Sequence, residues 1–136
     1  MTTQSLSRQL LGTWKLQNLE DLVGGEWVQT FGENPAGYFS FDASGCVSVQ
    51  FRKDRPAKAY ASDEPTAAEA LETLDGYLAY FGRYTVDEQA GTFTTVVEGA
   101  LNPALIGTKQ VRRFEIRGER LVVGDQVTYR RFFERA

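Results

Sequence analysis

The stretch GYFSFDASGCVSVQF at residues 37–51 contains two alternating runs of apolar residues, one on each side of a turn. The apolar positions in these two runs are Phe39, Phe41, Val47, Val49 and Phe51. A period of two places alternate side chains on the same face of an extended strand. The residues DASG between the runs are typical of a turn. The stretch therefore predicts a β-hairpin with one apolar face.

Strand patterns continue on both sides of this hairpin. In TWKLQNLEDL at residues 13–22, alternation places Trp14, Leu16 and Asn18 on one face and Leu19 on the other. A short strand is expected around residues 27–28. The C-terminal part of the chain returns to short strands with tight turns, in residues 82–100, 108–116, 120–124 and 127–135.

Two segments have helical features. Residues 3–11 predict a short helix that ends before Gly12. A longer helix over about residues 64–80 is predicted from apolar positions at helical spacing: Ala67, Ala70, Leu71, Leu74, Tyr77, Leu78 and Phe81. Ser62 or Asp63 is the expected N-cap, and Gly76 could end or kink the helix. Because this helix is rich in alanine and interrupts the strands, we expect it to be the most mobile element.

The order of these elements predicts an all-β fold with one or two short helices, as a single domain over residues 1–136. We count eight main strands, with the longer helix between the fourth and the fifth. Sequential antiparallel strands joined by short turns remove their open edges by closing into an eight- to nine-stranded up-and-down β-barrel. Such a barrel has room for side chains or one small ligand. A two-sheet sandwich is the alternative. It is less favoured because its topology needs longer crossing connections than the short turns of this sequence.

Composition limits the chemistry. The chain has a net charge of −3, no histidine and one cysteine, Cys46. Without a basic cluster, nucleic acid is not an expected partner. Without histidine, Ser-His-Asp catalysis and histidine-ligated metal sites are not expected, and no cofactor or metal is predicted. No apolar run is long enough for a membrane span and no signal-peptide pattern is present, which predicts a cytoplasmic protein, monomeric or homodimeric.

The order of several motifs resembles the lipocalin-like domain family of bacteria and fungi. The matching stretches are LLGTWKL at 10–16, FGENPAGYFSFDASGCVSVQF at 31–51, DRP at 54–56, YLAYFGRYTVDE at 77–88, VEGALNPALIGTKQVRRFE at 97–115 and GERLVV at 118–123. The resemblance implies a β-barrel that holds a small molecule, and the family's genes are often found near biosynthetic genes. In this chain Thr94 and Thr95 stand where the family usually carries histidine.

The resemblance also implies a role for the Gly12-Thr13-Trp14 motif. In lipocalins the tryptophan of a G-x-W motif plugs the closed end of the barrel, and an arginine of the last strand lies across its ring. That arginine would be Arg130 or Arg131 here, and we favour Arg131. Trp14 is accordingly expected to be structural rather than to contact ligand.

Arg112 is the main candidate for contact with a ligand. If Phe114 and Ile116 face the core, alternation turns Gln110 and Arg112 inward with them. Arg112 could then receive a carboxylate, phenolate or carbonyl group, or it could form an internal ion pair with Glu98 or lie at the barrel end. Glu98 is expected to be solvated, unless a bulge near residue 99 turns it inward.

Aromatic residues supply the other candidates. Tyr77, Tyr80, Phe81 and Tyr84 gather where the predicted helix meets the next strand, and they either touch a ligand or pack the helix. The expected ligand-binding residues are Phe39, Phe41, Tyr77, Phe81, Tyr84, Arg112, Phe114 and Tyr129. The catalytic candidates, if the protein is an enzyme, are Arg112, Glu98 and Tyr84.

Three functions remain open at this point. The first is a binder of an apolar or aromatic metabolite, linked to secondary metabolism through the resemblance. The second is a cofactor-independent cyclase, isomerase or dehydratase that acts on a polyketide- or terpenoid-like substrate in the barrel. The third is a filled barrel that interacts with other proteins. The interior distinguishes them: a buried carboxylate with a perturbed pKa favours the enzyme, an apolar cavity favours the binder, and a filled core favours the third.

Overall fold

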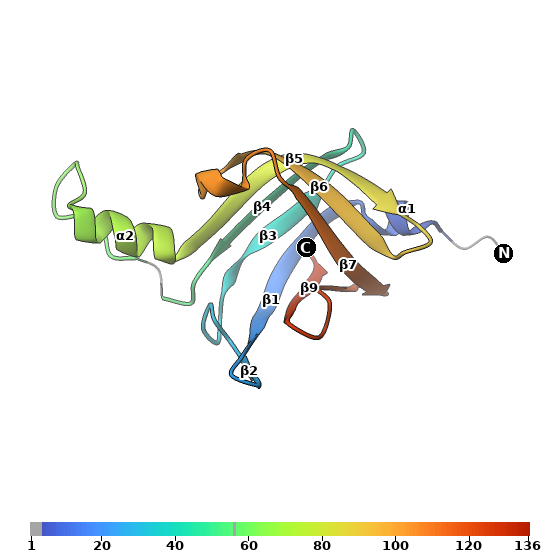
Figure 1. Ribbon diagram of the computed structural model, residues 1–136, viewed down its shortest axis with the longest axis horizontal. Coiled ribbons are helices and arrows are strands. Elements are labelled where there is room, and N and C mark those ends of the chain that lie inside the picture. Colours follow the sequence, from blue (N-terminus) through green and yellow to red (C-terminus); the bar gives the residue numbers. More distant parts are fainter. Residues whose placement is uncertain (1–3, 56) are drawn as a thin grey trace.

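A computed structural model describes residues 4–55 and 57–136, in which nine strands form one antiparallel sheet. The strands follow each other in chain order, and β1 also pairs with β9, so that eight strands close into a barrel and β2 lies outside beside β1 (Figure 1). The elements are α1 (Leu6–Leu10), β1 (Gly12–Val23), β2 (Glu26–Val28), β3 (Ala36–Phe41), β4 (Cys46–Arg52), α2 (Ala67–Asp75), β5 (Tyr77–Asp87), β6 (Thr92–Ala100), a 3-10 turn η1 (Pro103–Leu105), β7 (Lys109–Arg117), β8 (Arg120–Val123) and β9 (Tyr129–Arg135). The predicted up-and-down barrel is confirmed.

The barrel closes through a long pairing of β1 with β9. The register runs from Trp14 opposite Arg135 to Asp21 opposite Tyr129, with a bulge between Leu16 and Asn18. A bulge inserts one extra residue and exchanges the two faces of the strand beyond it. It therefore turns Leu19 into the core, and the predicted placement of Leu19 on the outer face is wrong.

Phenylalanine side chains fill the interior of the barrel between its closed end and its middle. Phe39 stacks on Phe41 with ring centroids 4.7 Å apart. Phe93 meets Phe41 edge-on at 5.1 Å, and Phe133 meets Phe39 at 5.8 Å. Edge-to-face and offset contacts of this kind add to the hydrophobic stabilisation from burial. The half of the barrel next to its closed end is therefore a packed core rather than a cavity.

Trp14 closes one end of the barrel, as the resemblance implies. Its side chain is 0% exposed, and its indole Nε1 donates a hydrogen bond to the Leu10 carbonyl at 2.9 Å. The arginine over its ring is Arg135, with the guanidinium carbon 3.9 Å from the ring centroid. The assignment of Arg131 to this contact is wrong because Arg131 pairs with Leu19, nearer the other end of the barrel.

Gly12 is required at the start of β1 for two reasons. Its φ of +113° is a conformation that residues with a side chain rarely adopt. A Cβ atom there would also lie 3.2 Å from Nη1 of Arg135. The same guanidinium donates from Nη1 to the Leu11 carbonyl at 2.6 Å and from Nη2 to the Gln9 carbonyl at 2.9 Å. Gly12 therefore leaves space for the arginine that joins α1, β1 and β9.

The longer helix is shorter than predicted. It begins after Thr66, which forms a capping box with Glu69, and ends at Gly76. Tyr77 already pairs with Arg52 of β4 and belongs to β5. The helical spacing of Tyr77, Leu78 and Phe81 was therefore misleading, and the expected N-cap at Ser62 or Asp63 is wrong.

The two helices lie at opposite ends of the molecule. Figure 1 shows α1 beside the closed end and α2 projecting from the other end. No residue of α2 is buried. In the part of the chain that the structure describes, no helix has both the length and the apolar character needed to cross a membrane.

We predict that Trp14→Ala acts mainly on stability. Truncating a large buried aromatic side chain costs about 3–5 kcal/mol, and urea unfolding measures this loss. The control is Trp27→Ala in β2, which removes a half-buried indole outside the barrel and should cost less. If Trp14→Ala keeps its stability and loses ligand binding, the assignment of Trp14 to the closed end is wrong.

We also predict that backbone amides of α2 exchange with solvent faster than those of β3 and β4. The helix buries none of its residues, whereas alternate side chains of both strands lie in the core. Hydrogen exchange followed by mass spectrometry measures the difference. Equal protection of the helix and the strands would show that α2 is held by more than its local hydrogen bonds.

Candidate functional site

A cavity of about 300 Å³ opens at the end of the barrel opposite Trp14. Phe39, Phe51, Leu78 and Val123 form its apolar wall, and all four point inward from their strands. Its polar lining consists of Asp21, Tyr80, Arg112, Tyr129 and Arg131. The packed phenylalanines on the side of the closed end make Phe39 the floor of the cavity, which therefore extends from the mouth of the barrel to about its middle.

Arg131 is held in the cavity wall by Asp21. Its Nη2 lies 3.0 Å from Oδ1 of Asp21, and its Nη1 donates to the Glu20 carbonyl at 2.8 Å. Thr30 donates a further hydrogen bond to the other oxygen of Asp21. Asp21 is thus engaged on both oxygens, and the charge of Arg131 is balanced within the protein.

Arg112 faces the same cavity without a carboxylate partner. Its Nη2 donates to Oε1 of Gln110 at 2.7 Å. Within residues 4–55 and 57–136, no carboxylate oxygen lies within 4.0 Å of its guanidinium. The charged groups in the cavity lining are two guanidiniums and one carboxylate, so the net charge of the lining is positive. Inside an apolar wall such a charge attracts an anion more strongly than it would in water.

Tyr129 lies beside both arginines. The guanidinium carbons of Arg112 and Arg131 are each 5.2 Å from the centroid of its ring. A cation within about 6 Å of an aromatic ring is attracted to the negative face of the ring. These contacts fix the two positive charges at the rim of the cavity.

Burial raises the pKa of Tyr80 above its usual value of 10.0, and the positive charge of Arg112 opposes this shift. The hydroxyl of Tyr80 therefore stays protonated at neutral pH. It can donate a hydrogen bond to a ligand, and it is a poor base.

The structure brings three of the expected ligand-binding residues together in this cavity: Phe39, Arg112 and Tyr129. The inward direction predicted for Arg112 is confirmed. Phe114 belongs to the packed core and not to the cavity lining, and its ring centroid is 5.6 Å from that of Phe93. Phe41 and Tyr84 lie near the closed end, where the Tyr84 hydroxyl donates to the Asp42 carbonyl at 3.0 Å.

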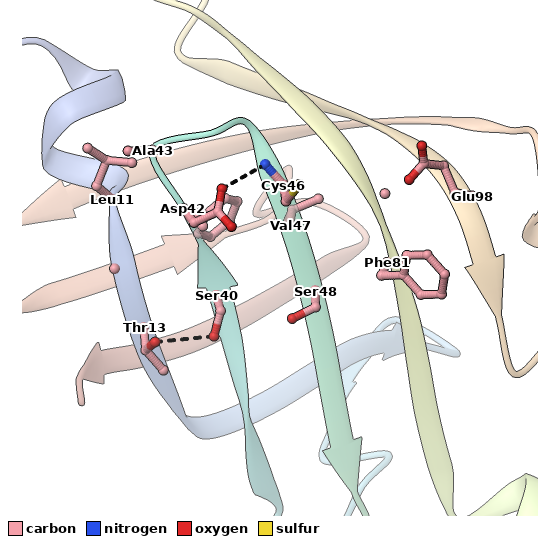
Figure 2. A pocket seen from close by; sticks show the side chains of 13 residues that line it. Leu11, Thr13, Ser40, Asp42, Ala43, Cys46, Val47, Ser48, Phe81 and Glu98 are labelled. Carbon is pink, nitrogen blue, oxygen red and sulfur yellow. Dashed lines mark hydrogen bonds between the residues drawn. The ribbon is translucent and has the colours of Figure 1, made fainter.

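Glu98, Phe81 and Tyr77 lie outside the barrel. Figure 2 shows Glu98 and Phe81 at a hollow on the outer face of the sheet, together with the hydroxyls of Thr13, Ser40 and Ser48. Glu98 is exposed, as expected for a solvated residue, and it does not pair with Arg112. The ring of Phe81 covers Gly99, and Tyr77 donates a hydrogen bond to Gln50. Of the four aromatic residues predicted at the helix–strand junction, only Tyr80 lines the cavity.

The sequence did not point to the remaining cavity residues as ligand contacts. These residues are Asp21, Phe51, Leu78, Val123 and Arg131. Alternation does place Phe51 and Val123 inward, but it does not say how high along the barrel they lie. Among the described residues, no group of three or more His, Cys, Asp or Glu side chains is arranged to hold a metal ion.

Comparison with known families agrees with this architecture. The sequence model of a family described as "Lipocalin-like domain" matches residues 11–132. The chain belongs to the lipocalin-like domain family. The match extends from β1 to the middle of β9 and so includes all or part of every strand of the closed barrel. Comparison with curated proteins gives no match. The lipocalin-like barrel is a fold associated with small-molecule binding in general, and it is consistent with a small hydrophobic ligand.

We predict that Tyr80 contributes to a loss of stability at alkaline pH. Its pKa is raised in the folded protein, so the unfolded chain releases the proton first. The free energy of unfolding should therefore fall as the pH rises above about 10, and Tyr80→Phe should make this fall shallower. Urea unfolding at several pH values between 8 and 11 measures both slopes. Identical slopes would contradict the burial of the Tyr80 hydroxyl.

Proposed function

We propose that this lipocalin-like protein binds an apolar or aromatic metabolite that carries an anionic or strongly hydrogen-bond-accepting group. The rings of Phe39, Phe51 and Tyr129 offer an aromatic wall for the apolar part. The family resemblance suggests secondary metabolism as the source of the metabolite.

The observation that supports this proposal most directly is the difference between Arg112 and Arg131. Both guanidiniums face the cavity, but among the described residues Arg131 alone has a carboxylate partner. Removing a charge from water is costly unless the protein or a ligand compensates it. Arg112 is compensated by one amide oxygen and by the ring of Tyr129, so it retains donors for a ligand. A carboxylate, acidic enol or polarised carbonyl is the chemical match for those donors.

We favour binding over catalysis by a cofactor-independent cyclase, isomerase or dehydratase. Such a reaction needs a group in the cavity that can take up a proton. The carboxylate in the cavity wall, Asp21, is occupied by Arg131 and Thr30. Tyr80 stays protonated because burial raises its pKa. These groups suit the recognition of a ligand better than general base catalysis.

The test is the substitution Arg112→Met, with Arg113→Met as its control. Methionine keeps much of the apolar stem and removes the charge. Arg113 is the next residue on β7 and is exposed on the outer face. NMR titration with 2-naphthoate measures affinity, and 2-naphthamide provides a neutral probe of the same shape. We expect Arg112→Met to weaken naphthoate binding at least about tenfold, or about 1.4 kcal/mol, because a charge-assisted hydrogen bond is lost.

The control variant should bind 2-naphthoate as the parent protein does, and 2-naphthamide should lose less affinity than 2-naphthoate. The stability of Arg112→Met should fall little or rise, because a partly desolvated charge is removed. Unchanged affinity for 2-naphthoate in Arg112→Met would overturn the proposal. Native mass spectrometry of the purified protein, to detect a retained metabolite, addresses the identity of the ligand.

A further inference from the structure

We infer that the ligand is an elongated amphiphile whose acidic head lies in the mouth cavity and whose apolar tail lies in a groove outside the barrel. This inference rests on the proposed function and specifies the class of ligand. The groove runs between α2, the 3-10 turn η1 and the start of β5.

The groove has a volume of about 540 Å³ and a mainly apolar lining. Leu71 and Leu74 of α2 face it with 68% and 50% of their surfaces exposed. Leu101 and Leu105, before and within η1, contribute to the opposite wall. Exposed leucines on both walls of a groove cost free energy unless an apolar partner covers them. The lining contains one charged residue, Asp75, whose charge is balanced by Lys53 at 3.0 Å.

The groove and the cavity have one lining residue in common. Leu78 of β5 lines both of them. A chain of hydrogen bonds also joins them: Thr108 donates to the Leu105 carbonyl at 2.6 Å, Gln110 donates to Thr108 at 2.7 Å, and Arg112 donates to Gln110 at 2.7 Å. A molecule bound at Arg112 can therefore reach the groove by extending past Leu78.

Packed aromatic rings occupy the interior of the barrel between the cavity and the closed end. Phe39 forms the floor, and its ring is stacked on Phe41, which in turn contacts Phe93 and Tyr84. Moving close-packed rings of this kind is costly. Because the head is held at the mouth, we expect the tail to lie in the groove that adjoins the cavity at Leu78.

The experiment uses 4-alkylbenzoates as probes. Benzoate, 4-butylbenzoate and 4-octylbenzoate have the same acidic head and an apolar tail of increasing length. If the tail is covered by the groove, each methylene group should tighten binding by about two- to fourfold, up to the length that the groove accommodates. NMR or fluorescence titration measures the series. Backbone exchange in α2 should also slow on binding of 4-octylbenzoate and not of benzoate.

The variant Leu74→Gln/Leu101→Gln places a polar side chain on each wall of the groove. It should retain the benzoate affinity of the parent and lose most of the gain with tail length. The control is Val111→Gln, which alters a residue that is 57% exposed on the outer face of β7, outside the groove. The control should retain the full gain.

The outcomes separate this inference from the proposed function. If benzoate binds through Arg112 but affinity does not rise with tail length, the groove is not a tail site and the proposed function stands. A gain that persists in Leu74→Gln/Leu101→Gln also overturns the inference, because the tail then lies elsewhere. If none of the acids binds, both the inference and the proposed function fail.

Discussion

The contact between Arg135 and Trp14 joins the last strand to the first, and the rest of the architecture depends on that closure. Eight hydrogen-bonded strands in a row have two open edges, which expose backbone donors and acceptors to other chains. Pairing of β1 with β9 removes both edges. The guanidinium over the indole ring holds this pairing at its end and also binds carbonyls at the end of α1. The end of the barrel at Trp14 is therefore closed and packed, and the candidate site lies at the opposite end.

At the open end two arginines lie among aromatic side chains, and they differ in the partners that compensate their charges. Arg131 is compensated internally by Asp21, which lies on the paired strand β1. Arg112 lies on β7, two strands away from β9, and the side chain that accepts a hydrogen bond from it is the amide of Gln110 on the same strand. Burying a charge with partial compensation lowers stability, and the packed phenylalanine core below can offset this cost. The stabilising core and the destabilising site thus occupy different heights of one barrel.

Sequence alone predicted the barrel, because a period of two is a local property of the chain. Alternation along the last strand puts Arg131, Phe133 and Arg135 on one face, and the structure buries Phe133. The arginine over Trp14 was predicted to be Arg131, and in the structure it is Arg135. That choice depends on the register between β1 and β9, which the bulge between Leu16 and Asn18 shifts.

The boundary between α2 and β5 illustrates a second limit of the sequence. Residues 77–81 fit a helical spacing and a strand equally well over so short a segment, and pairing of Tyr77 with Arg52 decides for the strand. Tyr80 consequently points inward and Phe81 outward. The presence of Tyr80 in the cavity therefore depends on the pairing of β5 with β4, which the sequence alone does not specify.

The helix α2 shows how a groove can remain open next to a packed barrel. A helix of nine residues is marginal in water, and its stability usually comes from packing of an apolar face. Here local polar contacts replace that packing. Thr66 and Glu69 cap the first turn, Glu69 also accepts a hydrogen bond from the backbone of Ala61, and the hydroxyls of Tyr60 and Thr73 are 2.9 Å apart.

Because these contacts involve polar groups on the helix and on the loop before it, they leave Leu71 and Leu74 uncovered. A helix held by packing would have used its leucines against the barrel and closed the groove. Holding α2 by its cap and its preceding loop keeps the apolar wall available, so that an apolar ligand tail buried there would add stability that the unliganded fold does not already contain.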